Sequence, residues 1–332
     1  LNVDVGTSVF EVEEGQTYLL RLINAAVNFH LYVGVAGHNL TIVNADAEYT
    51  EPLTRDIVVL APGQTSDVLL TANQAVGQYL LAASVFSPAN PAAVPYPTIP
   101  TTGIIRYKGA STNLSLTPSL SLPSFPLFND SIFVANFTQS LRGLPIDNSS
   151  RVPQTYDENL FFTVGYALNS CPNCTFRPFP GLRLSASINN VTFVDPLLSL
   201  QQAYYYNVNG TYQGDFPSNP LFEYNYTGAG PTNRRSELAT KVKLLKFNSK
   251  VQLILQNTAV LFFENHPIHL HGQNFYIVGS GFGTFNETKD TPNFNLINPP
   301  FRNTIGVPAG GWAALRFTAD NPGINVSSKC IL

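Results

Sequence analysis

The chain has 332 residues, of which 44% are hydrophobic and only 12% are charged, and its formal net charge is -3. Its 18 basic residues do not outnumber its 21 acidic ones, so no positive excess is available to bind a nucleic-acid backbone. Asn, Gly, Pro or a charged residue interrupts every apolar run before it reaches the roughly 18 residues that a membrane span needs. We therefore expect about two domains that bind neither nucleic acid nor membrane.

Acceptor sequences for N-linked glycans are dense in this chain. Low charge combined with abundant Asn, Ser, Thr and Tyr favours a secreted β protein that carries N-linked glycans, although the abundance of these residue types is an alternative explanation. Because the chain contains no Met and begins within a strand-like run, we interpret it as a fragment. The acceptors are Asn39, Asn113, Asn129, Asn136, Asn148, Asn173, Asn190, Asn209, Asn225, Asn286 and Asn325.

The first third of the chain is a succession of short strand-like runs separated by Gly, Pro, Asn and Asp. Short strands at spacings of about 8 to 15 residues predict a β-sandwich or barrel rather than a helical fold. We assign residues 1–109 to a first β-sandwich domain. The runs are 18–23, 31–35, 40–43, 56–60, 67–70, 79–85 and 103–107.

Residues 110–154 are rich in Ser, Pro and Leu, and the repeated prolines predict a linker without a core strand or a helix. The strand pattern then resumes, so residues 155–332 are predicted to form a second β-rich domain. Its strand-like runs are 161–164, 184–194, 242–247, 251–256, 275–278 and 312–317, with a helical turn expected at 196–203.

The two predicted domains contain similar segments in the same order. Leu19–Asn24 resembles Leu253–Asn257, and Gly37–Val43 resembles Gly272–Val278. Arg55-Asp56 is likewise matched further along by Arg302-Asn303. Ordered matches of this kind indicate a tandem repeat of one module.

Three of the five histidines, His266, His269 and His271, lie within six residues of one another. Side chains alternate between the two faces of an extended strand, so His269 and His271 should share a face while His266 points away. One strand could thus serve two metal centres, and imidazole suits copper and zinc. The alternative is three ordinary strand histidines that bond to their neighbours.

The repeat places this predicted metal site in the second domain alone. When Asn39 is aligned with Asn274, no metal ligand stands opposite any of the three histidines. The residues found there are Leu31, Gly34 and Ala36. The other two histidines, which we expect to be surface or hydrogen-bonded residues, are His30 and His38.

At these motifs the sequence resembles the plant laccases, members of the multicopper oxidase family that are built from three cupredoxin domains. The likeness extends to Gly323 and includes Gly-Gln-Thr-Tyr-Leu-Leu-Arg-Leu-Ile-Asn-Ala-Ala at 15–26, His-Pro-Ile-His-Leu-His-Gly at 266–272 and Arg-Phe-Thr-Ala-Asp-Asn-Pro-Gly at 316–323. The resemblance implies an all-β fold of tandem cupredoxin-like Greek-key β-sandwiches, which would be the second and third domains of such an enzyme.

The resemblance also implies the chemistry of a secreted, apoplastic laccase. Such an enzyme oxidises phenols, including lignin precursors and lignin-derived phenols, by one-electron steps and reduces oxygen to water with four coppers. The family pattern assigns His266 to the type 1 copper, His269 to the type 2 copper and His271 to a type 3 copper. An electron would enter from the phenol through the edge of the His266 ring.

The chain departs from the family pattern in two places. The two His-x-His pairs of the family's first domain have no counterpart in residues 1–332, and no His-Cys-His triplet follows Gly323. Cys330 has no flanking His and stands one residue too far along to replace the triplet's Cys. We therefore expect an incomplete copper set and no activity of this chain alone. The alternatives are a non-catalytic laccase-like glycoprotein with a structural or binding role and an ascorbate oxidase-like enzyme.

The three cysteines are predicted to form one disulfide. Cys171 and Cys174 are separated by Pro and Asn, a spacing that suits a local disulfide in a secreted chain and also occurs in redox or metal pairs. We expect the disulfide, with Cys330 as a free thiol.

Overall fold

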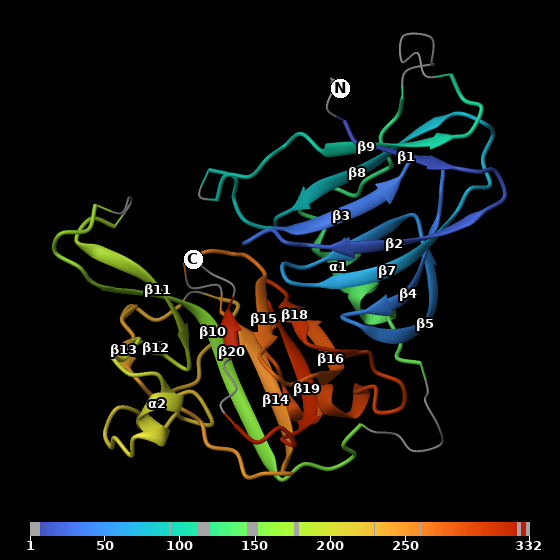
Figure 1. Cartoon of the computed structure of the whole chain (residues 1–332). Helices are drawn as coiled ribbons and strands as arrows, with labels where there is room; N and C mark the ends of the chain where they lie inside the picture. Colours follow the sequence, from blue (N-terminus) through green and yellow to red (C-terminus); the bar gives the residue numbers. More distant parts are fainter. Residues whose placement is uncertain are drawn as a thin grey trace. The chain divides into compact units, whose positions relative to one another are not determined.

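The structure is a computed structural model that describes residues 7–92, 94–111, 120–144, 152–175, 179–228, 230–258 and 261–323, and the backbone of 327–329. The chain forms two compact units (Figure 1). Unit 1 consists of 1–145 together with 300–304, and unit 2 consists of 146–299 together with 305–331. Strands dominate both units, which confirms the predicted all-β fold.

Unit 1 is a sandwich of two β-sheets. Its strands are β1 (Val9–Val12), β2 (Thr17–Ile23), β3 (His30–Val35), β4 (Leu40–Ala45), β5 (Glu48–Arg55), β6 (Ile57–Leu60), β7 (Thr65–Thr71), β8 (Gln78–Phe86) and β9 (Thr101–Tyr107). One sheet has the order β1-β9-β8-β3-β6 and the other β2-β7-β4-β5. Tyr32 from the first sheet and Leu40 and Leu70 from the second belong to one buried cluster, so the core lies between the sheets.

Alternation of side chains explains why these segments form strands. In β7, Ser66, Val68 and Leu70 are buried while the residues between them are partly exposed, as in a strand with one face toward a core. Two strands of unit 1 were not predicted. β1 is only four residues long, and β5 contains Pro52 and charged residues, which do not form the apolar pattern of a strand.

A helix, α1 (Ser131–Ser140), lies within the segment that we expected to contain none. It begins after Asp130, whose carboxylate accepts the Phe133 N–H at 2.9 Å and so caps the first turn. Its buried residues Val134 and Phe137 belong to the core of unit 1. The expectation for 110–154 was therefore wrong at α1. It was based on the many prolines of this segment, but none of them lies within the ten residues of the helix.

Unit 2 also contains two sheets. Its strands are β10 (Glu158–Ser170), β11 (Leu182–Ile188), β12 (Val191–Phe193), β13 (Glu237–Ala239), β14 (Lys250–Asn257), β15 (His266–Leu270), β16 (Phe275–Phe282), β18 (Thr304–Val307), β19 (Gly311–Thr318) and β20 (Ser327–Lys329). The larger sheet runs in the order β13-β12-β11-β10-β14-β19-β16, and the smaller is β18-β15-β20. β17 (Phe301–Arg302) falls within the segment 300–304.

Several predictions in unit 2 need correction. The single run 184–194 is two strands, because Asn189 and Asn190 take positive φ angles of 47° and 62° and turn the chain. The run 242–247 is not a strand. The helical turn expected at 196–203 is α2 (Leu200–Tyr205), which begins later because Ser199 forms a capping box. The described residues also form α3 (Glu287–Asp290) and the 3-10 turn η2 (Thr291–Asn293).

The topology confirms the tandem repeat. The order β2-β7-β4 in unit 1 recurs as β14-β19-β16 in unit 2, and β6-β3-β8 recurs as β18-β15-β20. The predicted matching segments thus occupy equivalent strands: β3 and β4 correspond to β15 and β16.

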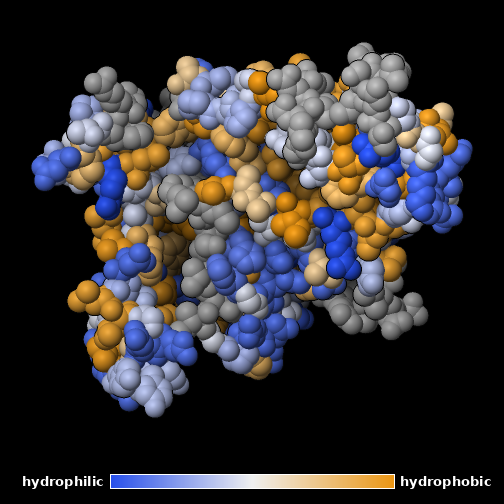
Figure 2. Space-filling model, turned by 45° about the horizontal axis from the view of Figure 1, so that its top comes forward, coloured by the Kyte–Doolittle hydropathy of each residue, from blue (hydrophilic) through white to orange (hydrophobic). Residues whose placement is uncertain are grey.

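The predicted disulfide between Cys171 and Cys174 is present, and Cys330 lies outside the described residues. On the face shown in Figure 2, hydrophobic residues lie in small groups among hydrophilic ones. None of the helices in the described ranges combines the length and apolar character needed to span a membrane.

Candidate metal centre

His266 is the first residue of β15, the central strand of the smaller sheet of unit 2. Its side chain is 1% exposed, and its ring meets the ring of Tyr166 edge to face, with centroids 5.3 Å apart. Little of this residue is therefore exposed to solvent. Electron entry through the edge of the His266 ring stays a prediction.

Tyr166 and Glu264 form a buried polar pair beside His266. The Tyr166 hydroxyl donates a hydrogen bond to Oε1 of Glu264, whose residue is 8% exposed. Burial, together with the negative charge of Glu264, raises the pKa of Tyr166 well above its ordinary value. The Tyr166 hydroxyl thus stays protonated and donates the hydrogen bond to Glu264. The sequence pattern did not indicate this pair, because Tyr166 on β10 is far from the histidines along the chain.

Two asparagines fix the segment that leads into β15. The side-chain amide of Asn257 donates to the Glu264 carbonyl at 2.9 Å, and Asn265 accepts the Ala309 N–H at 2.9 Å. All these groups are buried. Each hydrogen bond therefore offsets the free-energy cost of leaving a polar atom unpaired away from water. The backbone on which His266 stands is therefore held from two neighbouring segments.

His269 and His271 lie side by side. Their ring centroids are 4.8 Å apart and their planes meet at 67°. His271 immediately follows β15 and is exposed, whereas His269 is partly buried. The predicted pairing of these two side chains is confirmed, and His266 contacts Tyr166 instead. Within the described ranges, no group of three or more His, Cys, Asp or Glu side chains is placed to hold a metal ion.

The equivalent position in unit 1 is closed by packing. Gly34 on β3 matches His269, and a Cβ atom at Gly34 would lie 2.7 Å from Cδ1 of Ile57 and 3.0 Å from the Asp56 carbonyl oxygen. Real Cβ atoms do not tolerate the shorter of these distances without movement of a neighbour. Unit 1 therefore has neither a ligand nor room for one at this position.

The two histidines of unit 1 are both buried. His38 is hydrogen-bonded as expected, with Nδ1 at 2.8 Å from the Ala36 carbonyl and Nε2 at 2.7 Å from the Tyr107 hydroxyl. His30 is not at the surface, and its ring packs edge to face on Phe86. Burial lowers the pKa of His30 to about 4.

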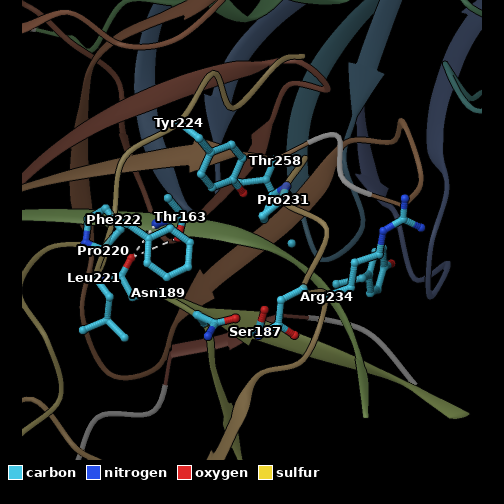
Figure 3. Close-up of a pocket in the computed structure, with 14 residues that line it drawn as sticks. Thr163, Ser187, Asn189, Pro220, Leu221, Phe222, Tyr224, Pro231, Arg234 and Thr258 are labelled. Atoms are coloured by element: carbon cyan, nitrogen blue, oxygen red, sulfur yellow. Dashed lines mark hydrogen bonds between the residues drawn. The ribbon is translucent and has the colours of Figure 1, made fainter. Parts of the chain in front are cut away.

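Tyr166 also lines a pocket of unit 2 that is partly open to solvent. Figure 3 shows Phe222 and Leu221 on one side of this pocket and Tyr224 with Thr258 on the other. Burial raises the pKa of Tyr224. The pocket is therefore lined by aromatic and polar side chains, and one wall residue touches the His266 ring.

Tandem β-sandwiches, with histidines clustered at one strand of the second unit, are typical of cupredoxin-type proteins. Sequence models of the multicopper oxidase family match residues 2–110 and residues 202–326. Because these ranges together span more than half of the sequence, the chain belongs to the multicopper oxidases. Membership in this family implies copper as the cofactor.

Curated relatives include several plant laccases. The chain is 50% identical to Laccase-4 of Arabidopsis thaliana, in an alignment covering 94% of this chain and 55% of that protein. It is 46% identical to Laccase-11 of Arabidopsis thaliana, covering 96% of this chain and 56% of the relative. It is also 46% identical to Laccase-22 of Oryza sativa subsp. japonica, covering 94% and 54%. The chain thus spans about half the length of these relatives.

Solved structures agree on the fold. The laccase from Botrytis aclada matches with a TM-score of 0.61 and 23% identity, covering 96% of this chain and 49% of that one. Fet3p, a multicopper oxidase that functions in iron import, matches with a TM-score of 0.69 and 19% identity, covering 98% and 54%. At these identities the likeness supports the cupredoxin fold.

Proposed function

We propose that this chain is part of a laccase-type enzyme that oxidises phenols by one-electron steps and reduces oxygen to water. The observation that carries the proposal is the adjacent rings of His269, on β15, and His271, directly after it, in a chain of the multicopper oxidase family. The high identity to plant laccases supports lignin precursors or lignin-derived phenols as substrates.

The three histidines of β15 and the following turn are the proposed copper ligands. His266 would bind the type 1 copper, His269 the type 2 copper and His271 a type 3 copper, as in the family pattern. Imidazole nitrogen is a ligand that copper prefers, and the rings of His269 and His271 lie side by side. When bound, copper supplies one-electron chemistry and the reduction of oxygen.

The chain's own residues would prepare this site in two ways. Asn257 and Asn265 hold the segment that leads into His266, so the backbone that carries this ligand would be in place before metal binds. Glu264 accepts from Tyr166, which fixes the tyrosine ring against His266. The pocket that Tyr166 lines would offer a phenol a wall that includes Phe222 and Tyr224.

We further propose that the chain is a glycoprotein secreted to the apoplast. Support comes from the disulfide between Cys171 and Cys174, since disulfides persist in oxidising compartments. Seven acceptor asparagines are exposed and thus open to modification: Asn39, Asn129, Asn136, Asn173, Asn209, Asn225 and Asn286.

A chimaera tests the enzymatic proposal directly. The matched residues of this chain would replace their counterparts in Arabidopsis Laccase-4, of which they cover 55%, and the rest of Laccase-4 would be kept. We expect the chimaera to bind copper, to show a blue absorption band and to consume oxygen with a monolignol. Replacing His269 by Ala should abolish oxygen uptake, while the exposed control Tyr205→Phe should not.

The same chimaera separates the alternative functions. A protein that binds no copper and consumes no oxygen, although it folds as the parent does, would contradict the proposal and favour a structural glycoprotein. Oxygen uptake that occurs with ascorbate and not with phenols would favour an ascorbate oxidase-like enzyme.

A further inference from the structure

A disulfide and a glycan acceptor share the tip of the β10–β11 hairpin. The acceptor sequence is Asn173-Cys174-Thr175, and its central residue is bonded to Cys171, three residues earlier. Asn173 and Thr175 are exposed. The two modifications therefore use overlapping residues of one short turn.

Cys174 is fixed at three points. Its N–H donates to the Cys171 carbonyl at 2.8 Å, and its carbonyl accepts the Gly181 N–H at 2.9 Å. Its sulfur is bonded to that of Cys171, and the two Cα atoms are 5.3 Å apart. The Cys171 N–H also donates to the Gly181 carbonyl at 2.9 Å, which closes the base of the turn. With the disulfide formed, the backbone between Asn173 and Thr175 cannot extend.

Attachment of a glycan places opposite demands on this turn. A glycosyltransferase has to engage the Asn amide and the hydroxyl two residues later at the same time, on a segment that can adapt to the enzyme. The disulfide closes a very short loop, so it can form as soon as both cysteines are available. Whichever modification comes first therefore hinders the other.

We propose that Asn173 is a glycan acceptor whose modification and the Cys171–Cys174 disulfide exclude each other, so that the hairpin tip exists in two covalent forms. The inference rests on the proposed passage through an oxidising secretory compartment. Glycosylation of Asn173 would then depend on whether Cys171 and Cys174 are already oxidised.

Each form results from a balanced reaction. In one, the Asn173 amide nitrogen loses a proton and bonds to the anomeric carbon of a sugar carried on a lipid diphosphate, which leaves. In the other, the two thiols lose two protons and two electrons to the disulfide of a thiol oxidoreductase, which becomes a dithiol.

The test is translation of the full chain into endoplasmic-reticulum microsomes, followed by mass spectrometry of the peptide containing residues 171–175. The main variant is Cys171→Ser, which removes the disulfide and leaves the acceptor sequence intact. Cys330→Ser is the matched control, because it removes a cysteine elsewhere. Occupancy at Asn209, which is exposed and has no neighbouring cysteine, reports whether translocation and transferase activity are normal.

We expect Asn173 occupancy to rise several-fold in Cys171→Ser, and also in the unaltered chain translated with dithiothreitol, while Asn209 occupancy stays constant. No molecule should carry both the glycan and the disulfide. A substantial doubly modified peptide, or an Asn173 occupancy that neither Cys171→Ser nor dithiothreitol changes, would overturn the proposal. Normal Asn209 occupancy in that case would leave the proposed secretion intact.

Discussion

The imidazole rings of His269 and His271 lie with their centroids 4.8 Å apart and their planes at 67°. The two residues are separated by Leu270 alone, the last residue of β15, and both side chains lie on one side as alternation along an extended chain predicts. The equivalent strand of unit 1, β3, has Gly34 where β15 has His269. The same module thus presents imidazole nitrogens at β15 of unit 2 and no such ligand at the matching position of β3 in unit 1.

Replacement of Gly34 by Ala should destabilise unit 1 by about 1–3 kcal/mol, since the added methyl must displace Ile57 or the backbone at Asp56. The control is Gly77→Ala, whose Cβ would have no neighbour closer than 3.6 Å. Urea unfolding followed by circular dichroism compares the two variants. Equal unfolding midpoints for both would refute the packing argument.

The pair of Tyr166 and Glu264 should stabilise unit 2. Tyr166→Phe removes the hydroxyl that donates to a buried carboxylate, and we expect a loss of about 1–3 kcal/mol in the free energy of unfolding. Tyr205→Phe removes an exposed hydroxyl of the same kind and should change stability by less than about 0.5 kcal/mol. The hydrogen bond would be energetically unimportant if the two variants unfolded alike.

A buried ion pair within unit 1 joins Asp46 to Arg302. The Arg302 guanidinium donates from Nε to Oδ2 at 2.9 Å and from Nη2 to Oδ1 at 3.0 Å. Asp46→Asn should cost about 3–5 kcal/mol, because it leaves a buried guanidinium without its counter-charge. Asn tolerates the positive φ of 52° at this position, so the variant keeps the backbone and removes the charge together with one acceptor oxygen.

The exposed pair of Lys108 and Glu13 provides the control for this prediction. Lys108→Ala should change the free energy of unfolding far less than Asp46→Asn does, as for other surface ion pairs. Chemical denaturation measures both variants, and a cost at Asp46 no larger than that at Lys108 would contradict the assigned role.

The strand pattern and the histidine spacing were sufficient to predict the fold class, the repeat and the pairing of His269 with His271. The alternation of buried and exposed residues, and the side of a strand on which a residue lies, depend on neighbouring residues and can be read from the sequence. The contact between Tyr166 and His266 depends on which strands lie together, which no local pattern specifies. α1 was missed because its stability comes from burying Val134 and Phe137 in a core formed by distant strands.

His30 should make the stability of unit 1 depend on pH. Burial lowers its folded-state pKa to about 4 from 6.5, so between these values the unfolded chain binds a proton that the folded chain does not. The contribution of His30 to the free energy of unfolding should be constant above pH 6.5 and should fall by on the order of 3 kcal/mol as the pH drops to 4. Below pH 4, His30 should cause no further change.

Urea unfolding at a series of pH values measures this dependence, and His30→Gln should remove most of the slope between pH 6.5 and 4. The His30 ring proton should also titrate near pH 4 in the NMR spectrum of the folded chain. An unchanged slope in the variant would show that other groups cause the pH dependence.

The most direct test of the proposed copper site is pulsed electron paramagnetic resonance of the 332-residue chain loaded with one equivalent of Cu(II). We predict coupling to two imidazole nitrogens, because adjacent rings on one strand can hold one ion. His269→Ala and His271→Ala should each remove one coupling and weaken binding at least about tenfold, a loss of about 1.4 kcal/mol. His30→Gln, the control in unit 1, should leave both couplings in place. A spectrum that neither alanine substitution alters would contradict the assignment of copper to this strand.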